Sequence, residues 1–362
     1  MQKSDGMNYA PESQGVLNTV CQPGEFGFSV IGLDHGHIFA MCNGLLEAGA
    51  TLRQVYDSDG EKLQAFLLRY PQGSIASSIQ EILNDSSCRL VVSAVKPCDR
   101  FGLGLKVMAS GKDYFVDKPG MLELEQVNEA REVCSRTGRK YMIYFGERIH
   151  VEGAVRTGQL IAQGAIGRVL HVTIMAPHRL SKASRPAWFF QQGVNGGIIA
   201  DLGSHQVEQF LSYTGAKTAR VAHSTLANYA NHEIPGFYDY GDASLIADNG
   251  ATCFFRVDWF TPAGLGAWGD GRVFIIGTEG TIEIRKYLDV ARSNMGDQIY
   301  LVDSSGEHHF EVAGKIGFPF FGEFILDCLN RTEFALAQEQ AFEAMRLAIT
   351  AQQQAEIVAI EV

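Results

Sequence analysis

The sequence has 362 residues, of which 46% are hydrophobic and 20% are charged. This composition excludes a disordered chain and a small disulfide scaffold, and the length favours two domains, because a single core rarely grows beyond about 250–300 residues. Lysine and arginine total 30 and aspartate and glutamate total 41, a net charge of −11. Because gripping phosphate backbones requires basic surfaces, this balance argues against a nucleic-acid partner and for small or neutral partners.

The cysteine pattern and the N-terminal segment indicate a reducing compartment. The seven cysteines are scattered and form no C-x-x-C pair, whereas zinc sites and disulfide frameworks need clustered spacing. Residues 1–25 lack the apolar run of a secretory signal, and no stretch of about 18 apolar residues is present to span a membrane. We therefore expect a cytoplasmic protein with a flexible N-terminal arm and no membrane partner.

Short apolar runs alternate with helical periodicity from Phe28 onward. The runs predict strands at 28–33, 52–56, 90–95, 114–116 and 140–145. Between them, apolar residues recur at helical spacing in three segments, 38–45, 63–70 and 127–134. Strands alternating with helices predict βαβ units on a doubly wound parallel sheet.

The pattern changes after about residue 150. A helix from Val151 towards Gln163, a strand at 169–175 and a helix at 204–213 precede a long β-rich region. Gly, Asn and Asp separate most of its runs, which indicates an open, mostly antiparallel sheet. The runs lie at 220–227, 244–247, 252–258, 272–276, 281–284, 298–302 and 308–312. Two helices, at 320–330 and 339–357, are expected to close the chain.

These patterns predict a flexible arm at 1–25, an α/β domain with a parallel sheet at 26–148 and an α+β domain at 149–362. The two terminal helices could pack back on the first domain. An exposed sheet face also predicts a homodimer or homotetramer, because large apolar patches rarely stay exposed to water.

The first predicted strand ends in a glycine-containing loop that leads directly into a helix. Open parallel sheets bind ligands beyond the carboxyl ends of their strands, where a dinucleotide fingerprint reads G-x-G-x-x-G. Gly32 occupies the first position, but Asp34 and His37 replace the other two glycines. A carboxylate at the second position would repel a pyrophosphate unless it turned away. The candidate cofactor-binding loop is Gly32, Leu33, Asp34, His35, Gly36 and His37.

An acidic residue, Asp57, ends the second strand. A carboxylate there can accept hydrogen bonds from an adenosine ribose and would repel a 2′-phosphate, so NAD is favoured over NADP. The alternative is that Asp34 is a helix N-cap and Asp57 a turn residue. The ends of the next two strands add four candidates for cofactor contacts, Val95, Pro97, Asp117 and Lys118.

The two histidines of the loop, His35 and His37, also invite a metal site. They supply at most two ligands, and no carboxylate or cysteine cluster accompanies them in the sequence. We therefore predict no metal.

Two further segments carry residues suited to proton transfer. The fourth strand ends in Asp117-Lys118-Pro119, and a lysine at the carboxyl end of a parallel strand faces the ligand crevice. Asp201 and His205 are spaced four residues apart, so a helix starting nearby would place them on one face. The glycines before them, Gly196 and Gly197, would let backbone approach a ligand. The alternatives are a surface lysine and a solvated Asp–His contact.

Together these segments resemble the Gfo/Idh/MocA family of oxidoreductases, which includes glucose–fructose oxidoreductase and inositol dehydrogenase. The family's E-K-P motif appears at residues 117–119 with Asp in place of Glu, and its G-G-…-D-x-G-x-H segment appears at 196–205. Residues 164–169 resemble the turn into the first strand of the substrate domain. The resemblance extends from about Phe28 onward and implies a Rossmann domain, an open sheet that often forms the dimer face, and a nicotinamide cofactor.

The residue types suit oxidation of a secondary alcohol, which removes a hydride to nicotinamide C4 and a proton from oxygen. His205 is the natural general base near neutral pH. Lys118 would hydrogen-bond the reacting oxygen and stabilise developing negative charge, and Asp201 would orient His205 or bind a neighbouring hydroxyl. We therefore expect these three residues to be catalytic.

Substrate contacts are expected after the first strand of the second domain, a region that borders the pocket in the family. Arg179 or Arg185 could bind an acid group. Trp188 could stack on a sugar ring or the nicotinamide, or it could anchor the loop in the core. Glu147-Arg148 could reach the crevice or form a hinge ion pair. The substrate-binding candidates are His178, Arg179, Arg185 and Trp188.

The sequence thus predicts an NAD(P)-dependent oxidoreductase acting on a sugar, a polyol or a related hydroxylated small molecule. Two alternatives use the same scaffold: a redox-neutral, glycosidase-type enzyme with tightly held NAD, and a non-catalytic nucleotide-binding regulatory protein. The atypical glycine loop favours the non-catalytic alternative, whereas Lys118, Asp201 and His205 argue against it.

Overall fold

The computed structural model describes residues 5–360, which divide into two compact units. The N-terminal unit comprises Met7–Tyr144 and Gly317–Ala341. The C-terminal unit comprises Phe145–Ile316, the chain from Phe342 onward and the described residues up to Gly6. The division after Tyr144 lies a few residues before the predicted boundary at 148. No helix within residues 5–360 is long and apolar enough to cross a membrane.

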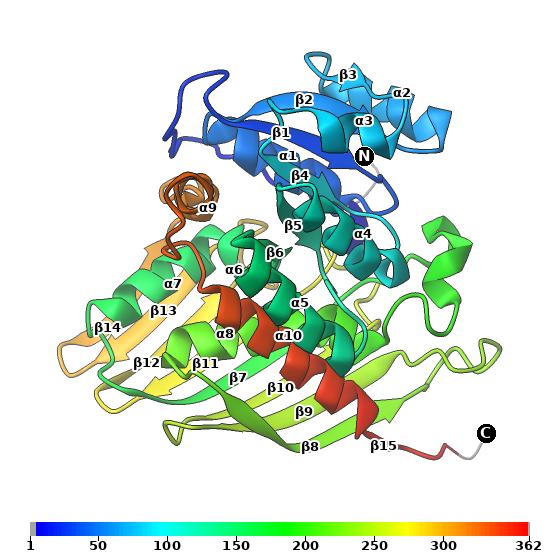
Figure 1. Cartoon of the computed structure of the whole chain (residues 1–362). Coiled ribbons are helices and arrows are strands. Elements are labelled where there is room, and N and C mark those ends of the chain that lie inside the picture. The colour runs from blue at the N-terminus through cyan, green and yellow to red at the C-terminus, as the bar shows by residue number, and fades with distance from the viewer. Residues whose placement is uncertain (1–4, 361–362) are drawn as a thin grey trace. The chain divides into compact units, whose positions relative to one another are not determined.

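The N-terminal unit is built on a six-stranded parallel sheet with the order β3-β2-β1-β4-β5-β6 (Figure 1), which is the strand order of the Rossmann fold. Four of its strands are buried along their whole length, as expected of a parallel sheet covered on both faces by helices. The strands are β1 (Gly27–Ile31), β2 (Thr51–Tyr56), β3 (Ser74–Ile75), β4 (Leu90–Ser93), β5 (Asp113–Asp117) and β6 (Tyr141–Tyr144).

The helices of this unit include two that the sequence pattern did not predict, α3 and α4. Gly104 interrupts the helical pattern of α4, since glycine has a low helix propensity. Close packing requires glycine at this position, because a Cβ there would lie 2.4 Å from the ring of Tyr141. The helices are α1 (His37–Glu47), α2 (Gly60–Arg69), α3 (Ile79–Asn84), α4 (Pro97–Ala109), α5 (Leu124–Thr137) and α9 (Pro319–Asn330), with a short 3₁₀ helix η1 (Gly6–Asn8) at its start.

The C-terminal unit is built on a nine-stranded sheet with the order β14-β13-β12-β11-β7-β10-β9-β8-β15. Only the β7–β10 and β8–β15 pairs are parallel, so the predicted open, mostly antiparallel sheet is confirmed. The strands are β7 (Val169–Pro177), β8 (Ala219–Ala227), β9 (Tyr240–Ala247), β10 (Thr252–Asp258), β11 (Arg272–Gly277), β12 (Gly280–Arg285), β13 (Gln298–Asp303), β14 (Gly306–Glu311) and β15 (Glu356–Ile357).

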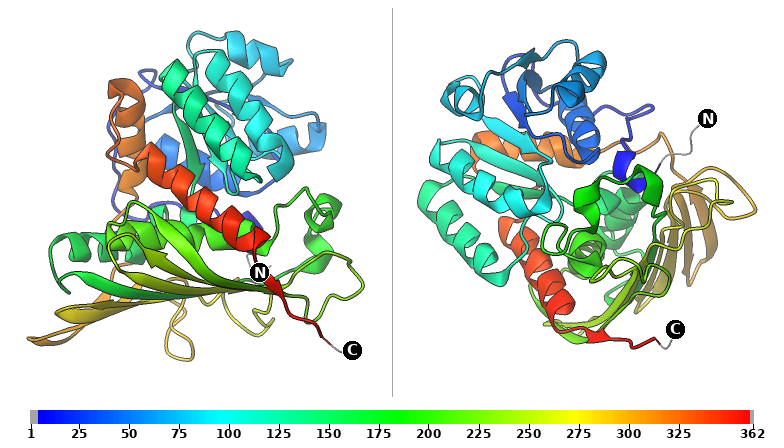
Figure 2. Two further views of the ribbon diagram at one scale, coloured as in Figure 1. Left: turned by 60° about the horizontal axis from the view of Figure 1, so that its bottom comes forward. Right: turned by 90° about the vertical axis from the view of Figure 1, so that its right-hand side faces the viewer.

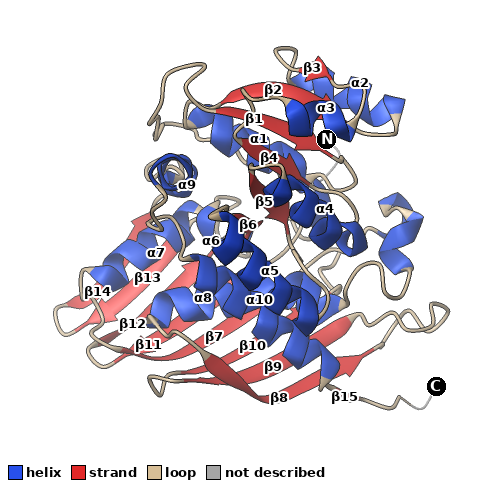
Figure 3. Ribbon diagram, viewed as in Figure 1, coloured by secondary structure: helices blue, strands red, loops and turns tan. Residues whose placement is uncertain are grey.

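Helices cover one face of this sheet (Figure 3). Seen nearly edge-on, the other face carries no helix among the described residues (Figure 2). Side-chain burial alternates along β9 and β10 accordingly, because alternate residues of a strand point to opposite faces. The helices are α6 (Gly146–Ile149), α7 (Glu152–Ala162), α8 (Ser204–Thr214), 3₁₀ helices η2 (Lys182–Ser184) and η3 (Ala187–Phe190), a π-helical turn η4 (Ile199–Gly203), and most of α10 (Gln338–Gln353).

Both ends of the described chain differ from expectation. The predicted helix 339–357 ends at Gln353, and Glu356 and Ile357 form the edge strand β15, because β8 offers unpaired backbone groups there. Before β1, the segment expected to be a flexible arm is hydrogen-bonded to the N-terminal unit. Val20 donates its amide to the Ala48 carbonyl at 3.0 Å, and Asn43 Nδ2 donates to the Pro11 carbonyl at 3.1 Å.

Candidate functional site

The loop between β1 and α1 begins with a tight turn at Gly32. Gly32 adopts a φ of +87°, and a Cβ built on it would lie 2.0 Å from Val95 Cγ1, so only glycine fits. The chain then enters α1 at His37. The strand–turn–helix context that a dinucleotide fingerprint requires is therefore present.

Asp34, at the second glycine position, is engaged with partners that neutralise it. Lys62 Nζ donates to Asp34 Oδ1 at 2.6 Å, and the Lys96 amide donates to Asp34 Oδ2 at 3.2 Å. The ion pair offsets the repulsion that an isolated carboxylate would exert on a pyrophosphate. The N-cap of α1 is Gly36, without a side-chain cap, so the alternative that Asp34 caps this helix is wrong.

Asp57 follows β2 and contacts the glycine loop. Its Oδ2 accepts from the Leu33 amide at 2.7 Å, and its Oδ1 accepts from the Asp59 amide at 2.8 Å. Asp57 is thus both a turn residue and a neighbour of the loop. Each carboxylate oxygen keeps a second lone pair that can accept a hydroxyl.

Asp117 lies at the centre of a buried charged cluster at the end of β5. His37 Nδ1 lies 2.8 Å from its Oδ1, His35 Nδ1 lies 3.3 Å from its Oδ2, and Arg100 Nη2 donates to Oδ2 at 3.0 Å. Burial opposes ionisation, but the charges of His37, Arg100 and His35 hold the pKa of Asp117 well below its usual range. Burial also holds the pKa of His35 well below its usual range, against the attraction of Asp117.

This cluster bears on the predicted absence of a metal. His35, His37 and Asp117 place one possible ligand atom each within 4.8 Å of one another, so the carboxylate that the sequence did not associate with the histidines comes from the end of β5. Arg100 donates to the same carboxylate and to two backbone carbonyls. A fixed guanidinium beside the ligand atoms disfavours a divalent cation.

Lys118, Val95 and Pro97 lie at the carboxyl ends of β5 and β4. Lys118 is 4% exposed, and its amide donates to Asp117 Oδ1 at 2.9 Å, so it is not a surface lysine. Val95 packs on Gly32. Pro97 is the first residue of α4, where the missing amide of proline costs no helical hydrogen bond.

Asp201 and His205 come from two different kinds of helix. Asp201 lies in the π-helical turn η4, and His205 lies in the first turn of α8. The π turn changes the helical phase, so the pair does not sit on the single regular helix that the four-residue spacing suggests. His205 is 3% exposed, which rules out a solvated contact.

The glycines before η4 build a turn. Gly196 and Gly197 both have a φ of +86°, which disfavours any side chain. A Cβ on Gly197 would lie 2.5 Å from the Gln352 side chain, whose Oε1 accepts from the Ile199 amide at 2.8 Å. The close approach that these glycines permit is therefore to Gln352 of α10.

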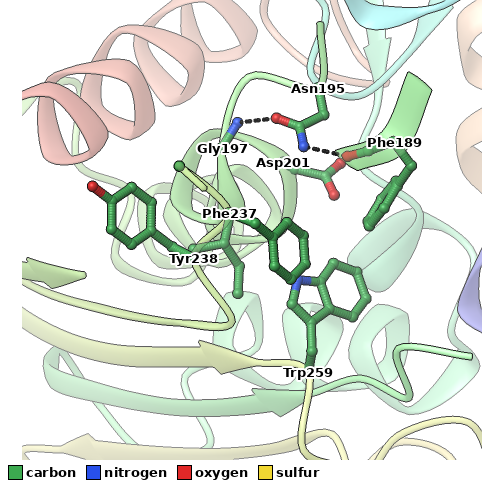
Figure 4. Close-up of a pocket in the computed structure, with 9 residues that line it drawn as sticks. Phe189, Asn195, Gly197, Asp201, Phe237, Tyr238 and Trp259 are labelled. Carbon is green, nitrogen blue, oxygen red and sulfur yellow. Dashed lines mark hydrogen bonds between the residues drawn. The ribbon is translucent and has the colours of Figure 1, made fainter. Parts of the chain in front are cut away.

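Asp201 lines a small pocket of the C-terminal unit (Figure 4). Aromatic rings form one part of the wall, and Asn195 and Asp201 add polar atoms. The Gly197 amide donates to Asn195 Oδ1 at 2.9 Å and so fixes its orientation. A wall that combines aromatic rings with a few placed polar groups is found in many small-molecule pockets. The lining residues are Phe189, Asn195, Gly197, Ile198, Asp201, Gly236, Phe237, Tyr238 and Trp259.

Two of the four substrate candidates lie beside this pocket. The Arg185 guanidinium lies 4.5 Å from the ring centre of Phe189 and 5.0 Å from that of Trp259. Burial lowers the pKa of Arg185, against the attraction of Asp5 and Asp201. The His178 ring lies edge-on to Trp259, at 5.6 Å between ring centres.

The other two candidates have structural roles. Arg179 Nη2 donates to the carbonyls of Pro262, Leu265 and Ala267 and so holds the loop that contains these residues in place. Trp188 is 9% exposed and packs edge-on to Phe189, which matches the loop-anchoring alternative.

Glu147 forms a buried ion pair that sequence reasoning did not place in the site. Lys286 Nζ donates to its Oε2 at 2.9 Å, and Gln206 Nε2 donates to its Oε1 at 3.1 Å. His178 Nε2 lies 3.7 Å from the same Oε1. The sequence indicated only a residue of the crevice or of a hinge ion pair at Glu147-Arg148, because no local signal connects residue 147 with residue 286.

The first described residues were also not predicted to reach a site. A Cβ on Gly6 would lie 3.1 Å from His178 Cδ2 and 3.1 Å from the ring of Trp268. These two rings would therefore crowd any side chain at position 6. In the N-terminal unit, the Met7 carbonyl and Asn8 lie against Gly36 of the glycine loop. A polar terminal segment carries no periodic signal from which these contacts could be found.

Models of one protein family match both parts of the chain. The description "Oxidoreductase family, NAD-binding Rossmann fold" applies to residues 26–145, and "GFO/IDH/MocA C-terminal domain" applies to residues 155–283. The two matches occur in the order, and at the places, of the two units.

Curated relatives are matched over part of their length. The scyllo-inositol 2-dehydrogenase (NAD(+)) of Bacillus subtilis (strain 168) is 27% identical over 205 residues, which cover 56% of this chain and 57% of that protein. The D-xylose dehydrogenase of Paenarthrobacter nicotinovorans is 21% identical over 149 residues, which cover 40% of this chain and 38% of that protein. The chain thus matches roughly two fifths to just over half of each relative.

Solved structures share the fold over most of the chain. An oxidoreductase structure from Erwinia carotovora atroseptica SCRI1043 is 46% identical, with a TM-score of 0.89 over 92% of this chain and 100% of that chain. A levoglucosan dehydrogenase in complex with NADH and levoglucosan shares the fold at 14% identity, with a TM-score of 0.76 over 91% of this chain and 97% of that chain. With both domains matched by one family, this chain belongs to the Gfo/Idh/MocA family of oxidoreductases.

Proposed function

We propose that this protein is an NAD-dependent dehydrogenase that oxidises a secondary alcohol of a neutral polyol or sugar, or reduces the corresponding ketone. The observation that carries the proposal is the burial of two titratable groups suited to oxyanion stabilisation and proton transfer, Lys118 and His205, together with a carboxylate, Asp201, that lines the pocket. Lys118 is 4% exposed at the end of β5, His205 is 3% exposed at the start of α8, and Asp201 lines the polar side of the pocket.

The N-terminal unit has residues that fit a dinucleotide. Gly32 provides the tight turn, Asp34 is neutralised by Lys62, and Asp57 stands beside the loop with lone pairs for a ribose. When bound, the nicotinamide supplies the acceptor or donor of the hydride. Asp57 favours NAD because its charge repels a 2′-phosphate; Lys62, close to Asp34, is the nearby group that could offset this preference.

The chain's own residues handle the proton and the substrate. In the oxidation direction the hydroxyl proton passes to His205 as the hydride leaves the carbon, and solvent later removes that proton. Lys118 donates a hydrogen bond to the oxygen as its negative charge develops. Asp201 accepts a hydrogen bond from a neighbouring hydroxyl. The alcohol thereby loses one hydride and one proton and becomes a ketone.

The pocket supports a neutral polyhydroxylated substrate. Aromatic rings such as Phe237 and Trp259 suit the apolar faces of a sugar ring, while Asn195 and Asp201 suit its hydroxyls. Arg179 is committed to backbone carbonyls and Arg185 lies near Asp5 and Asp201, so neither favours an acidic substrate. The names of the relatives, which act on inositol and xylose, agree with this class.

The testing experiment has two stages. The purified protein is titrated with NADH and NADPH, followed by quenching of protein fluorescence. Inositols, pentoses and anhydrosugars are then screened with the preferred cofactor for a change in nicotinamide absorbance. Binding of NADH with turnover of a neutral polyol is expected. Retained nicotinamide without net turnover would indicate the redox-neutral enzyme instead, and binding of neither cofactor would indicate the non-catalytic regulatory protein.

We also propose a homodimer or homotetramer formed through the sheet face of the C-terminal unit that helices leave uncovered (Figure 2). Exposed apolar side chains on this sheet include Ile276 at 46% and Val302 at 45%. Light scattering coupled to size-exclusion chromatography tests this: Ile276→Lys with Val302→Lys is expected to give a monomer, and an unchanged mass would exclude this face.

A further inference from the structure

Glu147 is braced inside the C-terminal unit by a chain of buried amides. Gln206 Nε2 donates to Glu147 Oε1, and Gln209 Nε2 donates to Gln206 Oε1 at 2.9 Å and to the His205 carbonyl at 3.0 Å. Gln206 and Gln209 are fully buried. This network ties the carboxylate to the turn of α8 that carries His205, so the position of one is coupled to that of the other.

The charge of Glu147 acts on two imidazoles. His178 Nδ1 lies 3.1 Å from the Ala176 carbonyl, which can only accept, so this nitrogen carries the proton. A neutral His178 therefore directs the Nε2 lone pair at Glu147 Oε1, 3.7 Å away, whereas a protonated one directs an N–H there. The carboxylate therefore favours the protonated form. Glu147 also interacts electrostatically with His205.

Lys286 keeps the carboxylate ionised in this buried setting. Burial alone would raise the pKa of Glu147, but the charges of Lys286, His205 and His178 together hold it below its usual range. Burial in turn lowers the pKa of Lys286, against the attraction of Glu147. An ion pair of two fully desolvated groups is maintained only when further hydrogen bonds satisfy it, as Gln206 does here.

We infer that Glu147 is a positioning residue of the active site, and that its carboxylate, held by Lys286 and Gln206, fixes the turn of α8 that carries His205 and sets the charge state of His205 and His178 during proton transfer. The inference rests on the proposed function, in which His205 exchanges the substrate proton. A carboxylate that supports an imidazole stabilises the imidazolium formed when the base accepts a proton.

Other charged groups surround this cluster within the C-terminal unit. Arg148 and Glu208 form a neighbouring ion pair at 2.6 Å, and Asp297 and Glu208 both attract Lys286. Asp201 lies one turn before His205 on η4. These groups are unchanged in the variants below, so a shift on substitution reports the Glu147–Lys286 pair.

The first test reads the imidazoles directly and does not depend on turnover. The full-length protein is titrated by NMR, and the signals of His178 and His205 are assigned with His178→Gln and His205→Gln. Removing the negative charge in Glu147→Gln is expected to lower both imidazole pKa values by about one unit, because a nearby opposite charge favours the charged form. Lys286→Met, which leaves the carboxylate uncompensated, is expected to raise them.

The second test uses the pH dependence of kcat/KM for alcohol oxidation. The rate rises with pH as the base loses its proton, so Glu147→Gln is expected to move this rise to lower pH and to lower the plateau about tenfold. Glu147→Asp is expected to restore the position of the rise. Glu343→Gln is the matched control, because Glu343 is a buried carboxylate of the same unit that pairs with Arg346.

The outcomes separate the two proposals. Shifted imidazoles without turnover of any polyol would uphold the Glu147 network and overturn the proposed dehydrogenase. Turnover with unshifted imidazoles and an unmoved pH profile would overturn the role of Glu147. If Glu147→Gln fails to fold, the double variant Glu147→Gln with Lys286→Met removes both charges, and its imidazole pKa values must still fall below those of the wild type.

Discussion

The two units each bury one carboxylate that pairs with a cation and faces two histidines, but they assemble this cluster differently. In the N-terminal unit Asp117 pairs with Arg100, 17 residues earlier in the chain. In the C-terminal unit Glu147 pairs with Lys286, 139 residues later. In the first cluster Arg100 of α4 joins Asp117 of the following strand β5, and the two histidines come from the loop after β1. In the second, Glu147 of α6 joins a lysine that follows β12.

The cations also differ in what they can do. Arg100 donates to Asp117 and to the carbonyls of Val95 and Pro119, so it holds a loop as well as a charge. Lys286 is a point charge whose pKa is lowered by burial. Arginine cannot lose its proton in a protein, but a buried lysine can. The Asp117 cluster is therefore a fixed part of the loop, whereas the Glu147 cluster contains a lysine that can lose its proton.

The largest expected effect is on kcat, and it compares one proposed catalytic residue from each unit. Lys118→Ala removes the proposed oxyanion-stabilising lysine of the N-terminal unit, and His205→Ala removes the proposed base of the C-terminal unit. Each is expected to lower kcat by about 10²–10⁴-fold, the usual contribution of a positioned acid or base. Steady-state kinetics measures this, with NADH titration as the control for nucleotide binding. Wild-type rates in both variants would show that the active-site residues lie elsewhere.

The second effect compares the two ion pairs as structural elements. Lys286→Met leaves Glu147 buried without its cation and is expected to cost about 3–5 kcal/mol of unfolding free energy. Arg100→Met is expected to cost less, because His35, His37 and the Lys118 amide remain on Asp117. Urea denaturation measures both. An equal or larger cost for Arg100→Met would contradict the view that the Asp117 cluster is the better supported of the two.

A third prediction concerns the pH dependence of stability. It rests on Asp297, whose pKa is shifted in the direction opposite to that of Glu147. Burial raises the pKa of Asp297 to about 6, so the folded state holds a proton that the unfolded state releases near pH 4. The stability contributed by this group is therefore present below about pH 4 and is lost as the pH rises to about 6, by at most about 3 kcal/mol. Asp297→Asn is expected to remove this loss.

Glu147 provides the contrast in the same experiment. Its pKa is lowered, so its contribution is present above about pH 4 and is lost as the pH falls. Denaturation of Asp297→Asn, Glu147→Gln and the wild type at several pH values should give slopes of opposite sign for the two variants relative to the wild type. Slopes of the same sign would refute the assignment of one of the two shifts.

A fourth prediction compares one glycine from each unit. Gly32→Ala would force a side chain at a φ of +87° and 2.0 Å from Val95, and is expected to destabilise the protein by about 1–3 kcal/mol. Gly158→Ala in α7 meets nothing within 4 Å and is expected to stabilise it by about 0.5–1 kcal/mol. Thermal unfolding measures both, and a neutral Gly32→Ala would remove the steric argument for the turn.

The last prediction concerns cofactor choice. Asp57→Ala removes the charge that disfavours a 2′-phosphate and is expected to change the ratio of NADH to NADPH affinity about tenfold in favour of NADPH, equivalent to about 1.4 kcal/mol. Asp57→Asn is the matched variant, because it keeps an acceptor for the Leu33 amide. An unchanged ratio in both variants would remove Asp57 from the ribose site.

Local patterns predicted much of this architecture. The alternation of apolar runs with helical periodicity indicated the parallel sheet, and the turn-separated β-rich runs indicated the antiparallel one, since these depend on residues near in sequence. Helix α4 was missed because Gly104 is placed by contact with Tyr141, and β15 was missed because its partner β8 lies far along the chain. Those two features follow from packing rather than from propensity.

The site divides in the same way. The sequence alone identified four of the candidates, because they lie at the ends of parallel strands or in short motifs: Gly32, Asp57, Lys118 and His205. Only the tertiary structure decided that Arg179 staples a loop, that Asp34 pairs with Lys62, and that Lys286, just after β12, reaches Glu147. Such pairings depend on the register of strands and the burial of charges, which arise when distant segments pack together and leave no periodic trace in the sequence.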